Sequence, residues 1–365
     1  MKNDSVIGSK TNQRNDYIDF LRGVAAIGIV AIHTAFWSGE SYTPEWFQSI
    51  TLLLDVPFFF FLSGWGSGYS NVSLKKTIKS LSGIWTKWIV FVIFLEMACV
   101  ILQFLHVLGA SSGLLDGRDF VNNVFFHVGF SGFPVVAGSI WFMPVYFVVL
   151  LCNTIILCLV RCDFLGGKEI ETYILIFVFL FLWIYNGNSF LGLDTSIATF
   201  LFYSIFWTIG FYLSKSDSGL KLSRMKLVRD VVIILIGAIV TNYLQHLPIY
   251  NIQAAKFPPS PKYGIVSLLS IEIAIFVQPF IKKGIIYKLC AHVGRNAIYY
   301  FFAQGVGSSL IYYYVKHMDI EYWIVKWTGA FLINLALTII IAELMGYAYR
   351  HICNMSINIF RMIRL

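Results

Sequence analysis

Arg22 and His33 are the two side chains best suited to chemistry, because both lie in an apolar segment long enough to cross a membrane. The eleven steps from position 22 to position 33 turn a helix by about 100° each, which places the two side chains within roughly 20° of one face, about 16 Å apart along the axis. Ionisable groups inside a bilayer are costly and usually mark a functional site. A cation and an imidazole on one helix stripe therefore predict a site for polar chemistry.

Each of these two residues also has a plainer interpretation. Asp19 stands three residues before Arg22, so the two can pair on one helix surface while Arg22 extends toward the inner lipid headgroups. His33 can be a structural hydrogen-bond donor, or it can transfer protons, since an imidazole titrates near neutral pH. The sequence leaves both pairs of interpretations open.

A second apolar segment begins at Asp55 and predicts a partner for His33. Pro57 is expected to kink this helix, and Gly64 with Gly68 forms a small-residue face that lets another backbone approach closely. The segment runs opposite to the first, so Asp55 is expected at about the depth of His33, where an Asp–His pair would orient the imidazole. In the alternative, Asp55 only hydrogen-bonds the backbone or a tyrosine.

The composition defines the class of protein that must hold these residues. A mean hydropathy of +0.73, with 58% apolar and 13% charged residues, excludes an ordinary soluble domain and predicts an all-α polytopic membrane protein. One transmembrane domain is expected over 17–350, between a polar tail at 1–16 and a short basic tail at 351–365. If a span needs about 20 apolar residues, ten helices are predicted, near 18–37, 47–69, 82–108, 142–162, 170–186, 195–214, 230–247, 263–281, 293–315 and 324–349.

The distribution of basic residues predicts the orientation of this domain. With the N-terminus in the cytoplasm, 22 of the 27 Lys and Arg residues fall on the inner side and 5 on the outer side, as cytoplasmic loops require. Both termini are therefore expected in the cytoplasm. This rule accounts for the net charge of +8, so no nucleic-acid partner is predicted. The six cysteines form no CxxC pair or metal-ligand cluster, so no disulfide and no metal site is expected.

Two outer segments and one inner cluster stand out between the predicted helices. The outer segment 109–139 mixes polar residues with an apolar patch, which is typical of a re-entrant or interfacial piece, and the prolines of 247–262 argue against a helix there. A basic cluster at an inner mouth attracts either anionic lipid headgroups or the phosphates of a soluble anionic cosubstrate. Its four members are Lys75, Lys76, Lys79 and Lys87.

Motifs in a fixed order connect these features to a known family. They are Leu-Arg-Gly at 21–23 followed by His33, Asp-Val-Pro-Phe-Phe-Phe-Phe-Leu-Ser-Gly at 55–64, the basic cluster, Ser-Ile-Trp-Phe-Met-Pro at 139–144, and Gly-Arg-Asn-Ala-Ile-Tyr-Tyr at 294–300. In this order and spacing the chain resembles the membrane-bound acyltransferase-3 family, from about Tyr17 to the last predicted helix. The predicted ten-helix topology agrees with that resemblance.

The resemblance implies transfer of an acyl group, commonly acetyl from acetyl-CoA, to a hydroxyl of a cell-surface polysaccharide or its lipid-linked precursor, at the plasma membrane. It implies acyl-CoA as a cosubstrate, no tightly bound cofactor, and membrane lipids as neighbours. Arg22 and His33 occupy the Arg-x10-His positions of the family, with His33 as the catalytic imidazole and general base. Ser63 stands at the Ser-Gly turn, and Trp141 in the Trp-Phe-Leu-Pro element, here with Met143 in place of Leu.

This chain also departs from the family pattern. The arginine-rich stretch is mostly lysine, so the four lysines of the basic cluster are expected to bind the CoA phosphates together with Arg22 and Ser63, although lysine lacks the guanidinium fork. Many relatives end the last motif with a histidine, where this chain has Gln304, so a second catalytic histidine is not expected there.

Four intramembrane carboxylates are candidates for the acid that orients His33. Asp55 ranks first because only its depth can be argued, and it is assigned a catalytic role beside His33. Trp141 and Glu272 are assigned to acceptor binding. The other intramembrane carboxylates considered as partners of His33 are Glu96, Glu272 and Glu343.

A rival hypothesis explains a ten-helix chain with buried charges equally well. A transporter or flippase for a lipid-linked sugar would line a pathway with such groups and make no covalent bond. The sequence also leaves open the acyl chain, the acceptor sugar, a covalent acyl-histidine step, and whether the chain forms a homo-oligomer.

Overall fold

Helices make up every regular element of the computed structural model in the part of the chain that it describes, as predicted for an all-α protein. The structure describes residues 15–70, 72–106, 117–127, 132–160, 169–186, 194–215, 224–245 and 251–363. The helices are α1 (Asp16–Phe36), α2 (Glu45–Thr51), α3 (Val56–Gly68), α4 (Leu74–Phe104), α5 (Gly117–Val124), α6 (Pro134–Ser139), α7 (Phe142–Val160), α8 (Glu169–Tyr185), α9 (Asp194–Lys215), α10 (Arg224–Gln245), α11 (Pro261–Val277), α12 (Ile285–Arg295), α13 (Ala297–Tyr314) and α14 (Trp323–Ile363). Short 3-10 turns lie at Leu52–Leu54, Gln253–Ala255, Gln278–Phe280 and Val315–His317.

Seven helical stretches within the described ranges are long and apolar enough to cross a membrane, so the chain is a multi-pass membrane protein. A helix lies in each of the ten predicted segments, but α8 is shorter than the seven. The count of ten spans and the cytoplasmic position of both termini stay predictions. Helix α14 continues to Ile363, past the predicted boundary at 350, and residues 1–14 of the predicted N-terminal tail lie outside the described residues.

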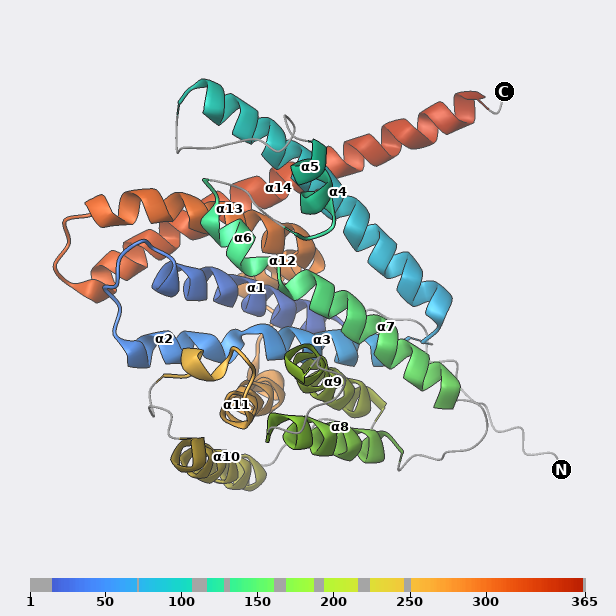
Figure 1. Ribbon diagram of the computed structural model, residues 1–365, viewed down its shortest axis with the longest axis vertical. Coiled ribbons are helices and arrows are strands. Elements are labelled where there is room, and N and C mark those ends of the chain that lie inside the picture. Colours follow the sequence, from blue (N-terminus) through green and yellow to red (C-terminus); the bar gives the residue numbers. More distant parts are fainter. Residues whose placement is uncertain are drawn as a thin grey trace.

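Helices α1 and α3 lie in the middle of the molecule (Figure 1). Helix α1 packs against α12, α13 and α14 on one side, and α3 packs against α9 on the other. Helix pairs α8–α9 and α10–α11 extend this second side, and the long helix α4 crosses the first side, where it meets α7, α13 and α14. The two helices with the predicted functional motifs are therefore surrounded by protein.

The contact between α3 and α9 confirms the close backbone approach predicted for the small-residue face of α3. A Cβ atom added to Gly64 would overlap the carbonyl oxygen of Trp207, and one added to Gly210 would overlap that of Phe61. Gly68 faces the same helix, at Ser214. Glycine is required at these positions because the two backbones touch.

Pro57 does not kink a continuous helix as predicted, but lies in the first turn of α3. The chain is extended at Asp55, and α3 starts at Val56 with Pro57 in its first turn. Proline fits a first turn because the N–H that it lacks would have no helical partner there. The predicted segment 47–69 is therefore two helices joined at Asp55, which turns this carboxylate toward neighbouring elements.

The outer segment 109–139 contributes α5 and α6 to the bundle, with residues 107–116 and 128–131 outside the described ranges. The indole of Trp88 on α4 donates a hydrogen bond to the carbonyl oxygen of Asn123 on α5 at 3.0 Å, and the Asn123 amide donates to Glu96 Oε1 at 2.6 Å. Helix α5 thus lies beside the part of α4 that carries Trp88 and Glu96. The same contact gives Glu96 a buried partner other than His33. The re-entrant and interfacial interpretations of this segment both stay predictions.

Candidate active site

His33 lines a small cavity on the predicted outer half of the molecule. This outer cavity has a volume of about 60 Å³, and its walls include Asp55, Trp141 and Lys256. The four residues come from α1, the start of α3, the turn before α7 and the segment before α11. The fold therefore brings together three residues predicted for the site, namely His33, Asp55 and Trp141.

Gln304 on α13 is the hydrogen-bond partner of His33. The Gln304 Oε1 atom lies 2.6 Å from His33 Nδ1, and the glutamine is buried. An amide oxygen only accepts hydrogen bonds, so Nδ1 carries the proton and the lone pair of Nε2 is left as the basic site. The sequence marked position 304 only as the place where relatives have a histidine, and it gave no sign of this contact.

Asp55 has partners other than His33. Its Oδ2 atom lies 2.7 Å from Lys256 Nζ and accepts a hydrogen bond from the Tyr263 hydroxyl at 2.7 Å. All three side chains are buried. The expected Asp55–His33 hydrogen bond is thus replaced by an ion pair, because the segment before α11 places Lys256 against the start of α3. The tyrosine contact agrees with the alternative predicted for Asp55.

Trp141 forms an aromatic wall of the outer cavity next to the lysine. The Lys256 ammonium lies 5.8 Å from the centre of the Trp141 ring and 5.3 Å from that of Phe257, and the two rings pack edge to face at 5.0 Å. Lys256 is thus held by a carboxylate on one side and by two ring faces on the other.

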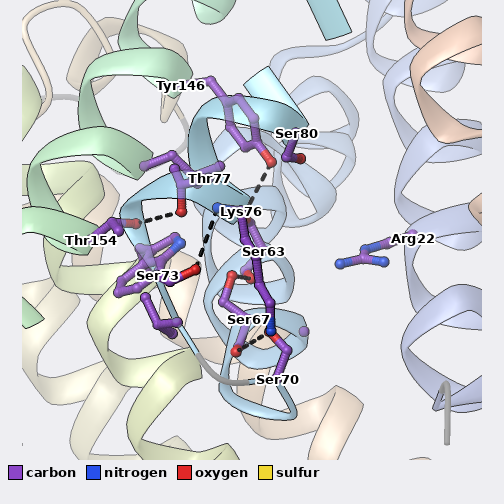
Figure 2. A pocket seen from close by; sticks show the side chains of 14 residues that line it. Arg22, Ser63, Ser67, Ser70, Ser73, Lys76, Thr77, Ser80, Tyr146 and Thr154 are labelled. Carbon is purple, nitrogen blue, oxygen red and sulfur yellow. Dashed lines mark hydrogen bonds between the residues drawn. The ribbon is translucent and has the colours of Figure 1, made fainter. Parts of the chain in front are cut away.

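Arg22 and Ser63 line a larger cavity at the predicted cytoplasmic end. This inner cavity has a volume of about 330 Å³ and also includes Lys76 on α4. Figure 2 shows Arg22 extending from α1 toward a wall of hydroxyl groups from α3, α4 and α7. The Ser63 hydroxyl hydrogen-bonds that of Tyr146 at 3.2 Å. Two cations and several hydroxyl donors in one cavity suit an anionic ligand such as a phosphate group.

The position of Arg22 is fixed by its neighbours on α1 and α3. Its Nη1 atom lies 3.6 Å from Asp19 Oδ1, which confirms the predicted pairing, and its Nη2 atom lies 3.4 Å from the Leu62 carbonyl oxygen. A Cβ atom at Gly66 would lie 2.5 Å from Arg22 Nη2. Glycine at position 66 therefore leaves the space that the guanidinium occupies.

A middle cavity of about 350 Å³ connects the two sites through shared wall residues. Arg22 and Ser63 line both the inner and the middle cavities. Phe142 and Phe301 line both the middle and the outer cavities. The three cavities thus form a row from Arg22 to His33. Arg295 also lines the middle cavity, a role that was not predicted although the residue lies in the last motif.

Several residues predicted for the site lie elsewhere. Lys75 and Lys79 are exposed and line none of these three cavities, whereas Lys76 on the same helix lines the inner one. The Lys87 ammonium lies 5.6 Å from the ring centres of both Tyr299 and Tyr349.

Two of the predicted carboxylates also lie away from the three cavities. Glu272 on α11 lines none of them. Glu343 on α14 has its own partners, since its Oε1 atom lies 2.7 Å from His292 Nε2 and accepts a hydrogen bond from the Tyr300 hydroxyl at 2.8 Å. Of the carboxylates considered as partners of His33, only Asp55 shares its cavity.

The fold and this row of cavities define a multi-pass membrane protein with an imidazole and a cationic cavity inside its helix bundle. Comparison with protein families gives the class: a model described as an acyltransferase domain matches residues 15–343, so the chain belongs to the acyltransferase-3 family and is a membrane acyltransferase. No curated protein and no solved structure matches the chain.

Proposed function

We propose that this acyltransferase takes an acetyl group from cytoplasmic acetyl-CoA and transfers it to a hydroxyl of a cell-surface polysaccharide or of its lipid-linked precursor. In this proposal His33 is the general base, Arg22 and Lys76 bind the phosphates of CoA, and the enzyme works in the plasma membrane. The protein needs no tightly bound cofactor, because the thioester itself supplies the activated acyl group.

One observation carries this proposal, namely the row of three cavities between Arg22 and His33. The inner cavity presents two cations and many hydroxyl groups at the predicted cytoplasmic end, where CoA is available. The outer cavity presents an imidazole and an indole ring at the other end, where a sugar can approach. A linear donor with phosphates at one end and a thioester at the other fits such an arrangement.

The chemistry of the transfer follows from the state of His33. A sugar hydroxyl is a weak nucleophile at neutral pH, and the free lone pair of His33 Nε2 accepts its proton as its oxygen attacks the thioester carbonyl carbon. A new C–O bond forms and the C–S bond breaks, so CoA leaves as a thiolate that takes up the proton. The indole face of Trp141 provides a surface on which a sugar ring can stack.

Steady-state kinetics of the purified protein with acetyl-CoA and an acceptor glycan test this assignment. We expect His33→Ala to reduce kcat by about 100- to 10,000-fold, the usual contribution of general-base catalysis. Arg22→Ala is expected to raise KM for acetyl-CoA by about tenfold or more, since a hydrogen bond to a charged group contributes about 1.5–3 kcal/mol. Release of the CoA thiol provides the measurement.

Two further variants separate specific effects from general ones. Gly66→Ala is expected to raise KM for acetyl-CoA without touching the donor directly, because the added methyl group displaces Arg22. Lys283→Ala removes an exposed cation before α12 that lines none of the three cavities, and it should leave KM unchanged. A His33→Ala protein that transfers acetyl normally would refute the assignment, and a protein that moves lipid-linked sugar without releasing thiol would be the flippase.

A further inference from the structure

Phe142 and Phe301 divide the row of cavities at one place. Both side chains line the middle cavity and the outer cavity, and their ring centres are 5.1 Å apart at an interplanar angle of 55°. The two residues come from different elements, since Phe142 begins α7 and Phe301 lies in the first turns of α13. Such tilted packing is a favourable arrangement for two aromatic rings, so the pair forms a stable narrow point between the two cavities, which we call the partition.

The neighbours of the two rings differ, which shows how the partition is held. Phe142 also packs against Phe60 at 5.5 Å and Tyr146 at 5.4 Å, so it belongs to an aromatic cluster around α3 and α7. Phe301 has one other ring contact in the described residues, with Phe302 at 5.9 Å. Phe142 is therefore held by more aromatic contacts than Phe301. Replacing Phe301 is expected to disturb the packing less.

The cavities on the two sides of this partition differ greatly in size. The middle cavity has a volume of about 350 Å³ and the outer cavity about 60 Å³. A donor that enters from the cytoplasmic end keeps its phosphates in the inner cavity and presents its acyl group first to His33. The acyl chain beyond the carbonyl carbon must then fit in the small outer cavity, together with the hydroxyl that it acylates.

We propose that the Phe142–Phe301 ring pair determines acyl-chain length, by limiting the space beside His33 to an acetyl-sized group. The inference rests on the proposed function, because it assumes that the donor is an acyl-CoA which reaches His33 through the middle cavity. Removing one ring joins the outer cavity to the middle one and makes room for additional methylene groups.

A series of acetyl-, propionyl- and butyryl-CoA tests this role through kcat/KM for thiol release in the presence of acceptor. One methylene group that does not fit an apolar pocket changes specificity by about 10- to 200-fold. We expect wild type to prefer acetyl- to butyryl-CoA by at least about tenfold. Phe301→Ala should reduce that preference by about tenfold or more, mainly through a gain with butyryl-CoA.

The matched control is Ile84→Ala, because Ile84 on α4 lines the middle cavity but not the outer one, whereas Phe59 packs against the Phe142 ring. This variant enlarges the donor cavity without opening the partition, so its acetyl-to-butyryl ratio should equal that of wild type. Phe301→Leu is a milder replacement that should give an intermediate ratio if the alanine variant does not fold.

A binding measurement gives a result that does not depend on turnover. In the His33→Ala background, competition with labelled CoA reports the affinities for acetyl- and butyryl-CoA, and adding Phe301→Ala should strengthen butyryl-CoA binding alone.

Equal use of both donors by wild type, or an unchanged ratio in Phe301→Ala and Phe301→Leu, would overturn the size limit while leaving the proposed function intact. Failure of CoA itself to bind would overturn the proposed function and this inference with it.

Discussion

The imidazole of His33 is held inside the helix bundle by the side chain of Gln304. His33 makes its hydrogen bond through Nδ1 to the amide oxygen of Gln304, at 2.6 Å. A neutral acceptor fixes the tautomer without adding a charge to a site surrounded by apolar helices, where unpaired charge is costly. Gln304 therefore acts as a positioning residue for the base.

Substitution of Gln304 tests this positioning role. Gln304→Met keeps the size of the side chain but removes the acceptor, and we expect kcat to fall by about 100-fold, as a misplaced catalytic group commonly causes. The KM for acetyl-CoA should change little, because Gln304 lines none of the three cavities. Gln304→Glu retains an acceptor for Nδ1–H and should keep more activity than the methionine variant.

A comparison of pH profiles separates this role from a structural one. If Gln304 only supported packing, the methionine and glutamate variants would show the same profile of kcat against pH. We expect the glutamate variant to shift the profile, since a carboxylate beside the imidazole stabilises its protonated form.

Some site residues could be predicted from the sequence alone, and others could not. Arg22 and His33 were predicted because an ionisable group in an apolar segment stands out against its neighbours. Gln304 was not predicted as the partner of His33, because the two positions are 271 residues apart and nothing local in the sequence links them. Arg295 was not predicted to line the middle cavity. Cytoplasmic helix ends commonly carry Lys and Arg, so one more cation at such an end gave no separate indication of a site.

At the element scale, the segment before α11 is attached to the start of α3 by a buried ion pair. Lys256 and Asp55 are 10% and 2% exposed at their side chains, and their charged atoms are 2.7 Å apart. Removal of one partner of a buried pair leaves an uncompensated charge, which typically costs about 3–5 kcal/mol. The pair thus holds one wall of the outer cavity in place.

A double-mutant cycle measures this attachment. Lys256→Met alone should lower the free energy of unfolding by about 3–5 kcal/mol, whereas adding Asp55→Asn should recover part of the loss, because no buried charge then remains unpaired. Thermal unfolding in detergent provides the measurement. Strict additivity of the two single changes would contradict the pair, since contacting residues show coupling energies of about 0.5–3 kcal/mol.

Helix contacts and helix boundaries could be predicted from the sequence only where a short local pattern determines them. The glycine spacing of α3 indicated a close helix contact, although the sequence gave no means to choose α9 as the partner. Pro57 was expected to kink a continuous helix, and the break at Asp55 with proline in the next first turn was not foreseen. Both outcomes satisfy the local rule for proline, so only the tertiary structure decides between them.

At the scale of the whole molecule, the central feature is the row of cavities between the two predicted faces of the membrane. Arg22 and Ser63 line both the inner and the middle cavities, and Phe142 and Phe301 stand between the middle cavity and the outer one. The helix count and the orientation can be argued from hydropathy and basic residues, but the cavities cannot, because they arise from contacts between helices far apart in the sequence.

In the proposed mechanism, a thioester from the cytoplasm reaches His33 through these cavities. A cryo-EM structure of the His33→Ala protein with acetyl-CoA tests it directly, because the donor should bind without being consumed. We predict density for the CoA phosphates between Arg22 and Lys76, and density for the thioester between the Phe142–Phe301 pair and position 33. Phosphate density far from Arg22, or an acyl end that stops short of the outer cavity, would show that the donor does not take this path.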